Sequence, residues 1–125
     1  MINKKKESKA YRDAFEKALQ KLRSVGFDEI KADFEGYDQP SKLINRSSDV
    51  TFIPDITAMN DGRKHYFEIA QKGDPRDLLL SKWKLLETMA SVRNGAFKVF
   101  APKGHIKFTE EFVSTYNIDA EIIRI

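Results

Sequence analysis

Residues 50–71 read VTFIPDITAMNDGRKHYFEIAQ, and this stretch decides the fold of the chain. It holds two strand-like runs, residues 50–59 and 63–71, separated by Asn60-Asp61-Gly62. Asp-Gly is a strong signal for a tight hairpin turn, because these residues tolerate the positive φ angles that such turns require. We therefore expect an antiparallel hairpin at this point in the chain.

The length of the turn decides which side chains share a face of the hairpin. If Asp61-Gly62 is a two-residue loop, Asn60 pairs with Arg63, and Asp55 lies opposite Glu68 with both carboxylates on one face. A four-residue loop keeps this register, whereas a three-residue loop moves the two acids to opposite faces. In the favoured register the second face is an apolar core surface made of Phe52, Ile56, Ala58, Phe67 and Ile69.

Two directly opposed carboxylates repel each other unless a positive charge lies between them. A divalent cation with oxygen ligands is the natural candidate for that charge. The alternative is that Asp55 and Glu68 are solvated on an open sheet face, as the surface charges of an unrelated domain. The first interpretation makes the hairpin a candidate metal site.

Helical signals lie on both sides of the hairpin. From Lys9 to Val25 apolar residues recur at helical spacing, and Gly26 provides a stop signal. After the hairpin, Asp74 is the expected N-cap of a second helix, Pro75 its first residue, and Asn94-Gly95 its end. The stripe that this helix should bury consists of Leu79, Trp83, Leu86 and Ala90.

Shorter elements complete the chain. Residues 28–34 suit a strand, and residues 36–46 are expected to form a loop because Asp38, Pro40 and Ser41 break regular structure. Residues 96–101 are typical of a buried strand, Thr109 is the expected cap of a third helix, and residues 120–125 alternate like a final strand. The order α-β-β-β-α-β-α-β belongs to an α/β domain, borderline α+β, with a mixed central sheet flanked by helices.

The composition limits the class of protein. A chain of 125 residues fits one domain, residues 1–125, with a basic amino-terminal stretch at residues 1–8. Without cysteine, disulfides and thiolate metal sites are excluded, and no run approaches the roughly 18 apolar residues of a membrane helix. No glycine-rich phosphate loop followed by Lys-Ser or Lys-Thr is present, so no nucleotide cofactor is expected. We expect a cytoplasmic protein, or one of the host cytoplasm if it is viral.

Pro54-Asp55, the hairpin, and Phe67-Glu68-Ile69 followed by a helix together resemble the PD-(D/E)XK nuclease superfamily. The resemblance covers residues 49–100 by motif and most of the chain by element order. The size of the chain, and Arg46-Ser47-Ser48 ahead of Pro54, are most similar to small Holliday-junction resolvases and phage-type endonucleases. The resemblance implies a restriction-endonuclease-like core of three layers.

The resemblance also implies the members of a site. Asp55 and Glu68 would bind Mg²⁺ or Mn²⁺ together with the backbone carbonyl of Ile69, and Glu16 on the first helix would complete the shell. Such a metal polarises a phosphate and lowers the pKa of a bound water, so the implied reaction is phosphodiester hydrolysis. The implied substrate is DNA, including structured or branched DNA, and the implied assembly is a homodimer.

The sequence departs from the motif at one position, because Ala70 stands where the family has a lysine. Lys72 shares the face of Glu68, but it lies about 7 Å too far along an ideal strand. A bent side chain, or a bulge near Gln71, would be needed to bridge that gap. Two lysines of the next helix are the other candidates, Lys82 and Lys84. If none reaches the site, the alternative is a catalytically inactive module of this fold that binds nucleic acid or a protein partner.

Basic side chains are the candidates for contacts with DNA phosphates. A net charge of +3 and a pI near 9.1 are compatible with a polyanionic partner. The residues expected to contact nucleic acid are Lys5, Lys6, Arg46, Ser47, Lys82 and Lys84. The two histidines, His65 and His105, lack the spacing of a zinc site, and His65 is expected to be structural.

Overall fold

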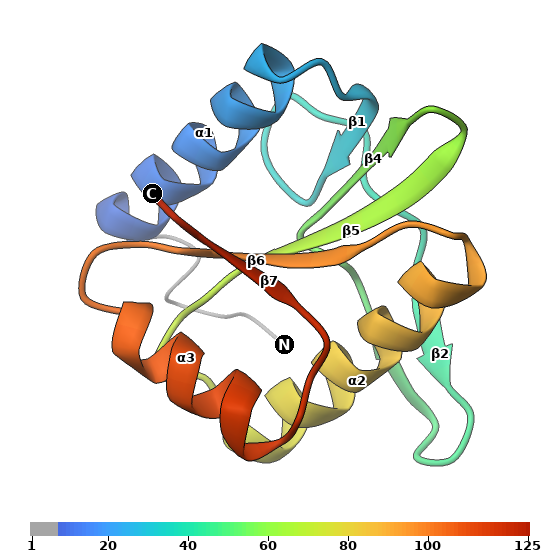
Figure 1. Cartoon of the computed structure of the whole chain (residues 1–125), viewed down its shortest axis with the longest axis vertical. Helices are drawn as coiled ribbons and strands as arrows, with labels where there is room; N and C mark the ends of the chain where they lie inside the picture. The colour runs from blue at the N-terminus through green and yellow to red at the C-terminus, as the bar shows by residue number, and fades with distance from the viewer. Residues whose placement is uncertain (1–7) are drawn as a thin grey trace.

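The computed structural model describes residues 8–125 of the chain (Figure 1). The expected contacts of Lys5 and Lys6 lie outside the described residues. The elements in chain order are α1 (Lys9–Ser24), β1 (Asp28–Ala32), β2 (Leu43–Asn45), β3 (Val50–Phe52), β4 (Ile56–Asn60), β5 (Arg63–Ile69), α2 (Arg76–Val92), β6 (Phe97–Ala101), α3 (Ile106–Thr115) and β7 (Glu121–Arg124).

The centre of the fold is a mixed sheet of five strands in the order β1-β4-β5-β6-β7. Strand β4 runs antiparallel to both β1 and β5, whereas β5, β6 and β7 are parallel to one another. Each parallel crossover carries a helix, α2 between β5 and β6 and α3 between β6 and β7. The fold is therefore α+β with a mixed sheet, which is compatible with the α/β class expected from the element order.

Helices cover both faces of the sheet, so the sheet has a separate hydrophobic core on each side. Figure 1 shows α1 on one side and α2 and α3 on the other. The first core joins α1 to the sheet through Phe15, Leu19, Ile56, Phe67 and Phe100. The second core joins α2 and α3 to the opposite face through Tyr66, Trp83, Leu86, Val99 and Phe112. No helix within residues 8–125 has both the length and the apolarity needed to cross a bilayer.

The register of the hairpin is the one that a two-residue loop predicts. Asn60 pairs with Arg63, and the pairing continues to Ile56 opposite Phe67. Asp61 and Gly62 have φ angles of 52° and 75°, which is the backbone of a tight turn with two positive φ angles. The side chains of Ile56, Ala58, Phe67 and Ile69 enter the first core, so the apolar face was predicted correctly except for Phe52.

The expectation of one continuous strand over residues 50–59 is wrong. Strand β3 ends at Phe52 and β4 begins at Ile56, because Pro54 between them has no backbone N–H for a sheet ladder. Instead β3 pairs with β2 in a separate two-stranded sheet, and Phe52 is half-buried there, away from the core face. Strand β2 lies in the segment expected to be loop, so residues 36–46 were also misassigned in part.

The caps of two helices differ from the predictions. Pro75, not Asp74, is the N-cap of α2, and its carbonyl accepts the N–H of Leu79 at 3.0 Å. Helix α3 begins at Ile106, so Thr109 lies inside it, and its hydroxyl donates to the carbonyl of His105 at 2.7 Å. The buried stripe of α2 is the predicted one, Leu79, Trp83, Leu86 and Ala90.

Candidate functional site

The two acids of the hairpin lie at one end of the sheet, where β4 begins and β5 ends. Asp55 directly precedes β4, and Glu68 is the penultimate residue of β5. Asp55 is 3% exposed and Glu68 is 2% exposed, because α2 packs over the face that carries them. The alternative of two solvated acids on an open sheet face is therefore wrong.

Each acid is held by a backbone N–H from the other acid's strand. The N–H of Asp55 donates to Oε2 of Glu68 at 2.7 Å, and the N–H of Ile69 donates to Oδ2 of Asp55 at 2.8 Å. The carbonyl of Asp55 also accepts the N–H of Asp33 at 2.9 Å, which ties this segment to β1. Hydrogen bonds to ionised acceptors are short and strong, so they fix both carboxylates. Oδ1 of Asp55 and Oε1 of Glu68 are left to bind other groups.

A lysine from α2 contacts both of these oxygens. The ammonium of Lys82 lies 3.0 Å from Oε1 of Glu68 and 3.7 Å from Oδ1 of Asp55, and its side chain is 16% exposed. Ala70, which occupies the lysine position of the motif, is fully buried in the core against α2. The motif normally has a lysine two residues after Glu68, and here Lys82 of the next helix supplies that cation instead. This was one of the alternatives that the sequence left open.

Trp83, the neighbour of Lys82, also contacts Glu68. Its indole Nε1–H donates to Oε1 of Glu68 at 3.3 Å. The ring is fully buried and makes edge contacts with Phe97 and Phe112, at centroid distances of 6.0 and 5.2 Å. Trp83 is therefore the core residue that the helical stripe predicted, and it additionally orients one of the two acids.

The charges of this cluster change the pKa of its members in a consistent way. Burial and the negative charge of Asp55 raise the pKa of Glu68 to about 7, although Lys82 opposes this shift. Burial by itself lowers the pKa of Lys82, but the charges of Glu68 and Asp55 outweigh it and raise that pKa above its ordinary value. Lys82 therefore remains an ammonium near neutral pH, while Glu68 is poised to gain or lose a proton.

The acids open onto a cavity of about 400 Å³. Its walls come from α1, from β3, from the turn after β5 and from α2, and its polar lining includes Tyr11, Thr51, Asp55, Glu68, Gln71, Asp74 and Lys82. Burial, followed by the charges of Asp55 and Glu68, raises the pKa of Tyr11, so its phenol stays neutral and can donate a hydrogen bond. The cavity combines fixed acceptors, one cation and a neutral donor.

Two residues expected at this site lie elsewhere. Glu16 is exposed on α1 and does not line the cavity, because Tyr11 is the residue that α1 turns toward it. Lys72 is also exposed and does not line the cavity, and its backbone N–H donates to Nδ1 of His105 at 3.1 Å. Gln71, the residue before it, lines the cavity instead.

The other expected nucleic-acid contacts lie around the β2–β3 hairpin. Arg46 and Ser47 are exposed at its tip, where the N–H of Ser47 donates to Oδ1 of Asn45 at 3.1 Å. Lys84 is on α2 but does not reach the acids, because its ammonium lies 3.8 Å from Glu87 and donates to the carbonyl of Asn117 at 3.3 Å. Arg46 and Lys84 line a common surface hollow on that side of α2.

Tyr11 and Asp74 are members of the cavity that the sequence did not identify. Tyr11 is one of the apolar residues at helical spacing in α1 and packs in the first core, yet it also lines the cavity of the two acids. Asp74 was assigned to helix capping, and the shift of the cap to Pro75 leaves its carboxylate in the lining. The signal that could have identified Tyr11 is a tyrosine on the buried stripe of a helix that is expected to pack near the two predicted acids.

The donor set of the site suits a hard cation. Within residues 8–125, no group of three or more His, Cys, Asp or Glu side chains is arranged to hold a metal ion. Mg²⁺ keeps several waters and is typically held by one or two carboxylates. Oδ1 of Asp55 and Oε1 of Glu68 fit that requirement, since they already converge on a cation, the ammonium of Lys82.

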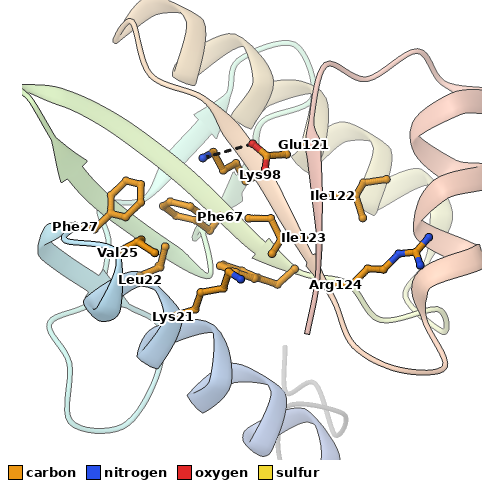
Figure 2. A pocket seen from close by; sticks show the side chains of 11 residues that line it. Lys21, Leu22, Val25, Phe27, Phe67, Lys98, Glu121, Ile122, Ile123 and Arg124 are labelled. Carbon is orange, nitrogen blue, oxygen red and sulfur yellow. Dashed lines mark ion pairs between the residues drawn. The ribbon is translucent and has the colours of Figure 1, made fainter.

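A larger cavity, of about 620 Å³, lies between the carboxy-terminal end of α1 and strand β7 (Figure 2). Its floor is apolar, with Phe27, Phe67 and Ile123 pointing into it. Its ion pair joins Lys98 to Glu121 at 3.5 Å, and this pair is partly exposed. The larger cavity has no pair of fixed carboxylates, so the smaller cavity at Asp55 is the better candidate for chemistry.

No protein-family model matches the chain, and neither a curated protein nor a solved structure matches it significantly. An assignment of function therefore depends on the residues and the geometry described above.

Proposed function

We propose that this protein is a Mg²⁺-dependent endonuclease of the PD-(D/E)XK type that hydrolyses phosphodiester bonds in DNA. The observation that carries the proposal is the contact of Lys82 with the buried Asp55–Glu68 pair, at 3.0 and 3.7 Å, on the wall of an open cavity. Two carboxylates and one lysine are the groups that this chemistry requires.

The arrangement of the elements supports the same class. Without the β2–β3 hairpin, which is inserted between β1 and β4, the chain runs α1, β1, β4, β5, α2, β6, α3, β7. This is the α-β-β-β-α-β-α-β order expected for a restriction-endonuclease-like core, with helices on both faces of a mixed sheet. The acids lie on β5 and just before β4, which are the positions that the motif requires.

The proposed roles follow from the contacts of each side chain. Oδ1 of Asp55 and Oε1 of Glu68 would hold the metal, and the carbonyl of Ile69 would be the third protein ligand that the resemblance implies. When bound, Mg²⁺ polarises the phosphate and lowers the pKa of a coordinated water. Lys82 orients the attacking water and stabilises the negative charge that develops on the phosphate. Tyr11, a neutral phenol in the same cavity, donates a hydrogen bond to a phosphate oxygen.

The rival function is an inactive module of the same fold, and one observation favours it. Lys82 contacts both acids and offsets part of their charge, and no buried polar atom of the three side chains lacks a hydrogen-bond partner. The active enzyme is the better proposal because a buried ion pair is rarely needed for stability, since apolar residues of similar size do as well or better. The cluster also faces an open cavity, whereas an ion cluster inside a packed core would be sealed from solvent.

Cleavage assays separate the two functions. The protein is incubated with linear, supercoiled and four-way-junction DNA in Mg²⁺ or Mn²⁺, alongside Asp55→Asn, Lys82→Ala and the control Arg63→Gln, an exposed residue at the other end of β5. We expect metal-dependent cleavage that Asp55→Asn and Lys82→Ala reduce by at least about 100-fold, while Arg63→Gln stays near the unmodified rate. Cleavage that persists in Asp55→Asn would rule out this site. Binding without cleavage of any substrate would favour the inactive module.

A homodimer is part of the same proposal, because the resemblance implies two-fold assembly for enzymes that cut both strands. Sedimentation analysis of the purified chain, with and without DNA, tests it directly. A monomer on every substrate would restrict the proposed activity to one strand at a time.

A further inference from the structure

A further hollow of the molecule is small, lined by basic side chains and adjacent to the proposed active site. It has a volume of about 180 Å³ and lies between α1, the turn after β5 and the β6–α3 turn. Lys17, Lys103 and His105 line it, and Gln71 lines both this hollow and the cavity of Asp55 and Glu68. The two hollows are therefore neighbours that share Gln71 in their lining.

Three exposed lysines define this basic shelf. Lys17 and Lys103 line the hollow, and Lys72 is joined to it because its backbone N–H donates to Nδ1 of His105 at 3.1 Å. The shelf thus gathers charges from three separate segments of the chain, α1, the end of β5 and the end of β6. Such a convergence differs from a run of lysines along one solvated helix.

The positive charge of the shelf is not cancelled by neighbouring acids. Within residues 8–125, no ion pair joins Lys17, Lys72 or Lys103 to a carboxylate. The acid that lines the hollow, Asp13, is bound to Lys9 at 3.1 Å. A surface with three free ammonium groups attracts an extended polyanion.

Backbone hydrogen bonds hold the turn that carries Lys103 and join it to the carboxy-terminal strand segment. The N–H of His105 donates to the carbonyl of Pro102 at 2.9 Å, which closes the turn that carries Lys103. The N–H of Ile125 donates to the carbonyl of Ala101 at 3.2 Å. Figure 1 shows the carboxy-terminal end beside the first turns of α1, where this hollow lies.

We propose that the shelf of Lys17, Lys72 and Lys103 binds the phosphates of duplex DNA that flank the scissile bond. This inference depends on the proposed function, because it takes the cavity of Asp55 and Glu68 as the place of cleavage. A strand that leaves this cavity past Gln71 reaches the shelf next. Lys72 thereby has a role in substrate binding, outside the reacting cluster.

The test measures DNA binding without cleavage, in full-length protein that carries Asp55→Asn. The anisotropy of a short labelled duplex is followed over a range of salt concentrations for this parent, for Lys17→Gln, Lys72→Gln and Lys103→Gln, and for the triple variant. Arg63→Gln is the matched control, because Arg63 is also exposed and begins β5, about 17 Å along the strand from Glu68. Circular dichroism checks that each variant is folded.

We expect each lysine variant to lower the slope of log affinity against log salt by about 0.9, and to weaken binding roughly fivefold to tenfold at about 0.1 M salt. Arg63→Gln should leave both quantities unchanged. A triple variant that binds like the Arg63→Gln control would overturn the shelf and leave the proposed nuclease intact. Failure of the parent to bind any duplex at low salt would overturn the nuclease itself. Shelf-dependent binding of polyglutamate, with duplex binding unaffected, would assign the surface to an acidic protein.

Discussion

Replacing Lys82 by methionine keeps most of the length of the side chain but removes the ammonium that lies 3.0 Å from Glu68 and 3.7 Å from Asp55. The side chains of Asp55 and Glu68 are 5% and 3% exposed, so they would remain buried without a nearby cation. Removing one partner of a buried ion pair typically costs about 3–5 kcal/mol of unfolding free energy. We expect Lys82→Met to lose an amount in that range at alkaline pH.

The loss should depend on pH and on metal in a defined direction. Glu68 has a pKa of about 7 in the folded protein, above its ordinary value, and the loss of Lys82 raises this pKa further, so protonation favours the folded state as the pH falls. Below the folded pKa Glu68 gains a proton and the repulsion is relieved, so the variant should recover part of its stability there. Excess Mg²⁺ should also restore it, because the cation replaces the missing charge.

Urea denaturation above and below the Glu68 pKa, with and without Mg²⁺, measures these changes. Lys84→Met is the control, since Lys84 is on the same helix but its side chain is 45% exposed, and its replacement should change stability by less than about 0.5 kcal/mol. If Lys82→Met loses no more unfolding free energy than the control, the ammonium of Lys82 does not stabilise the buried acids. Equal losses at both pH values would show that packing, not charge, is responsible.

A change of pH and two further substitutions have outcomes that follow from contacts in the structure. The affinity for Mg²⁺ should fall about tenfold per pH unit below the Glu68 pKa of about 7, because a protonated carboxyl is a poor ligand, and calorimetric titration measures this. Trp83→Phe keeps an aromatic core residue but removes the indole donor to Glu68. It should weaken metal affinity by roughly 10-fold to 100-fold, while the melting temperature stays close to that of the unmodified protein. Gly95→Ala should lose about 2 kcal/mol or more in urea denaturation, because a Cβ there would lie 1.8 Å from the carbonyl oxygen of Lys64, and retention of full stability would show that this turn can move.

The hairpin could be predicted because its signals are local. Asp61-Gly62 specifies the turn, the turn specifies the register, and the register places Asp55 and Glu68 on one face. The stripe of α2 was also predicted residue by residue, since helical periodicity depends only on neighbouring positions in the chain.

The errors occurred where contacts between distant segments decide the structure. Pro54 ends the ladder, and β3 then pairs with β2, a strand of three residues that carries almost no signal of its own. Whether Tyr11 or Glu16 faces the cavity of the acids depends on how α1 is rotated against the sheet. Periodicity alone does not fix that rotation closely enough.

The position of the lysine shows the same limit at the site. Ala70 indicated that the usual lysine is missing, and distance along an ideal strand counted against Lys72, but nothing local distinguished Lys82 from Lys84. The packing of Trp83 into the core makes the distinction, because it directs the preceding residue toward Glu68. A substitution in a motif therefore needs the tertiary structure before it can be interpreted as a loss of function.

The central claim is that Asp55 and Glu68 together form one binding site for a divalent cation. Electron paramagnetic resonance of Mn²⁺ titrated into the purified protein tests it most directly, because free and bound Mn²⁺ give distinct signals. We expect one saturable site per chain, competed by Mg²⁺ and abolished in Asp55→Asn, with Lys84→Ala unchanged. Equal Mn²⁺ binding by the unmodified protein and Asp55→Asn would contradict it.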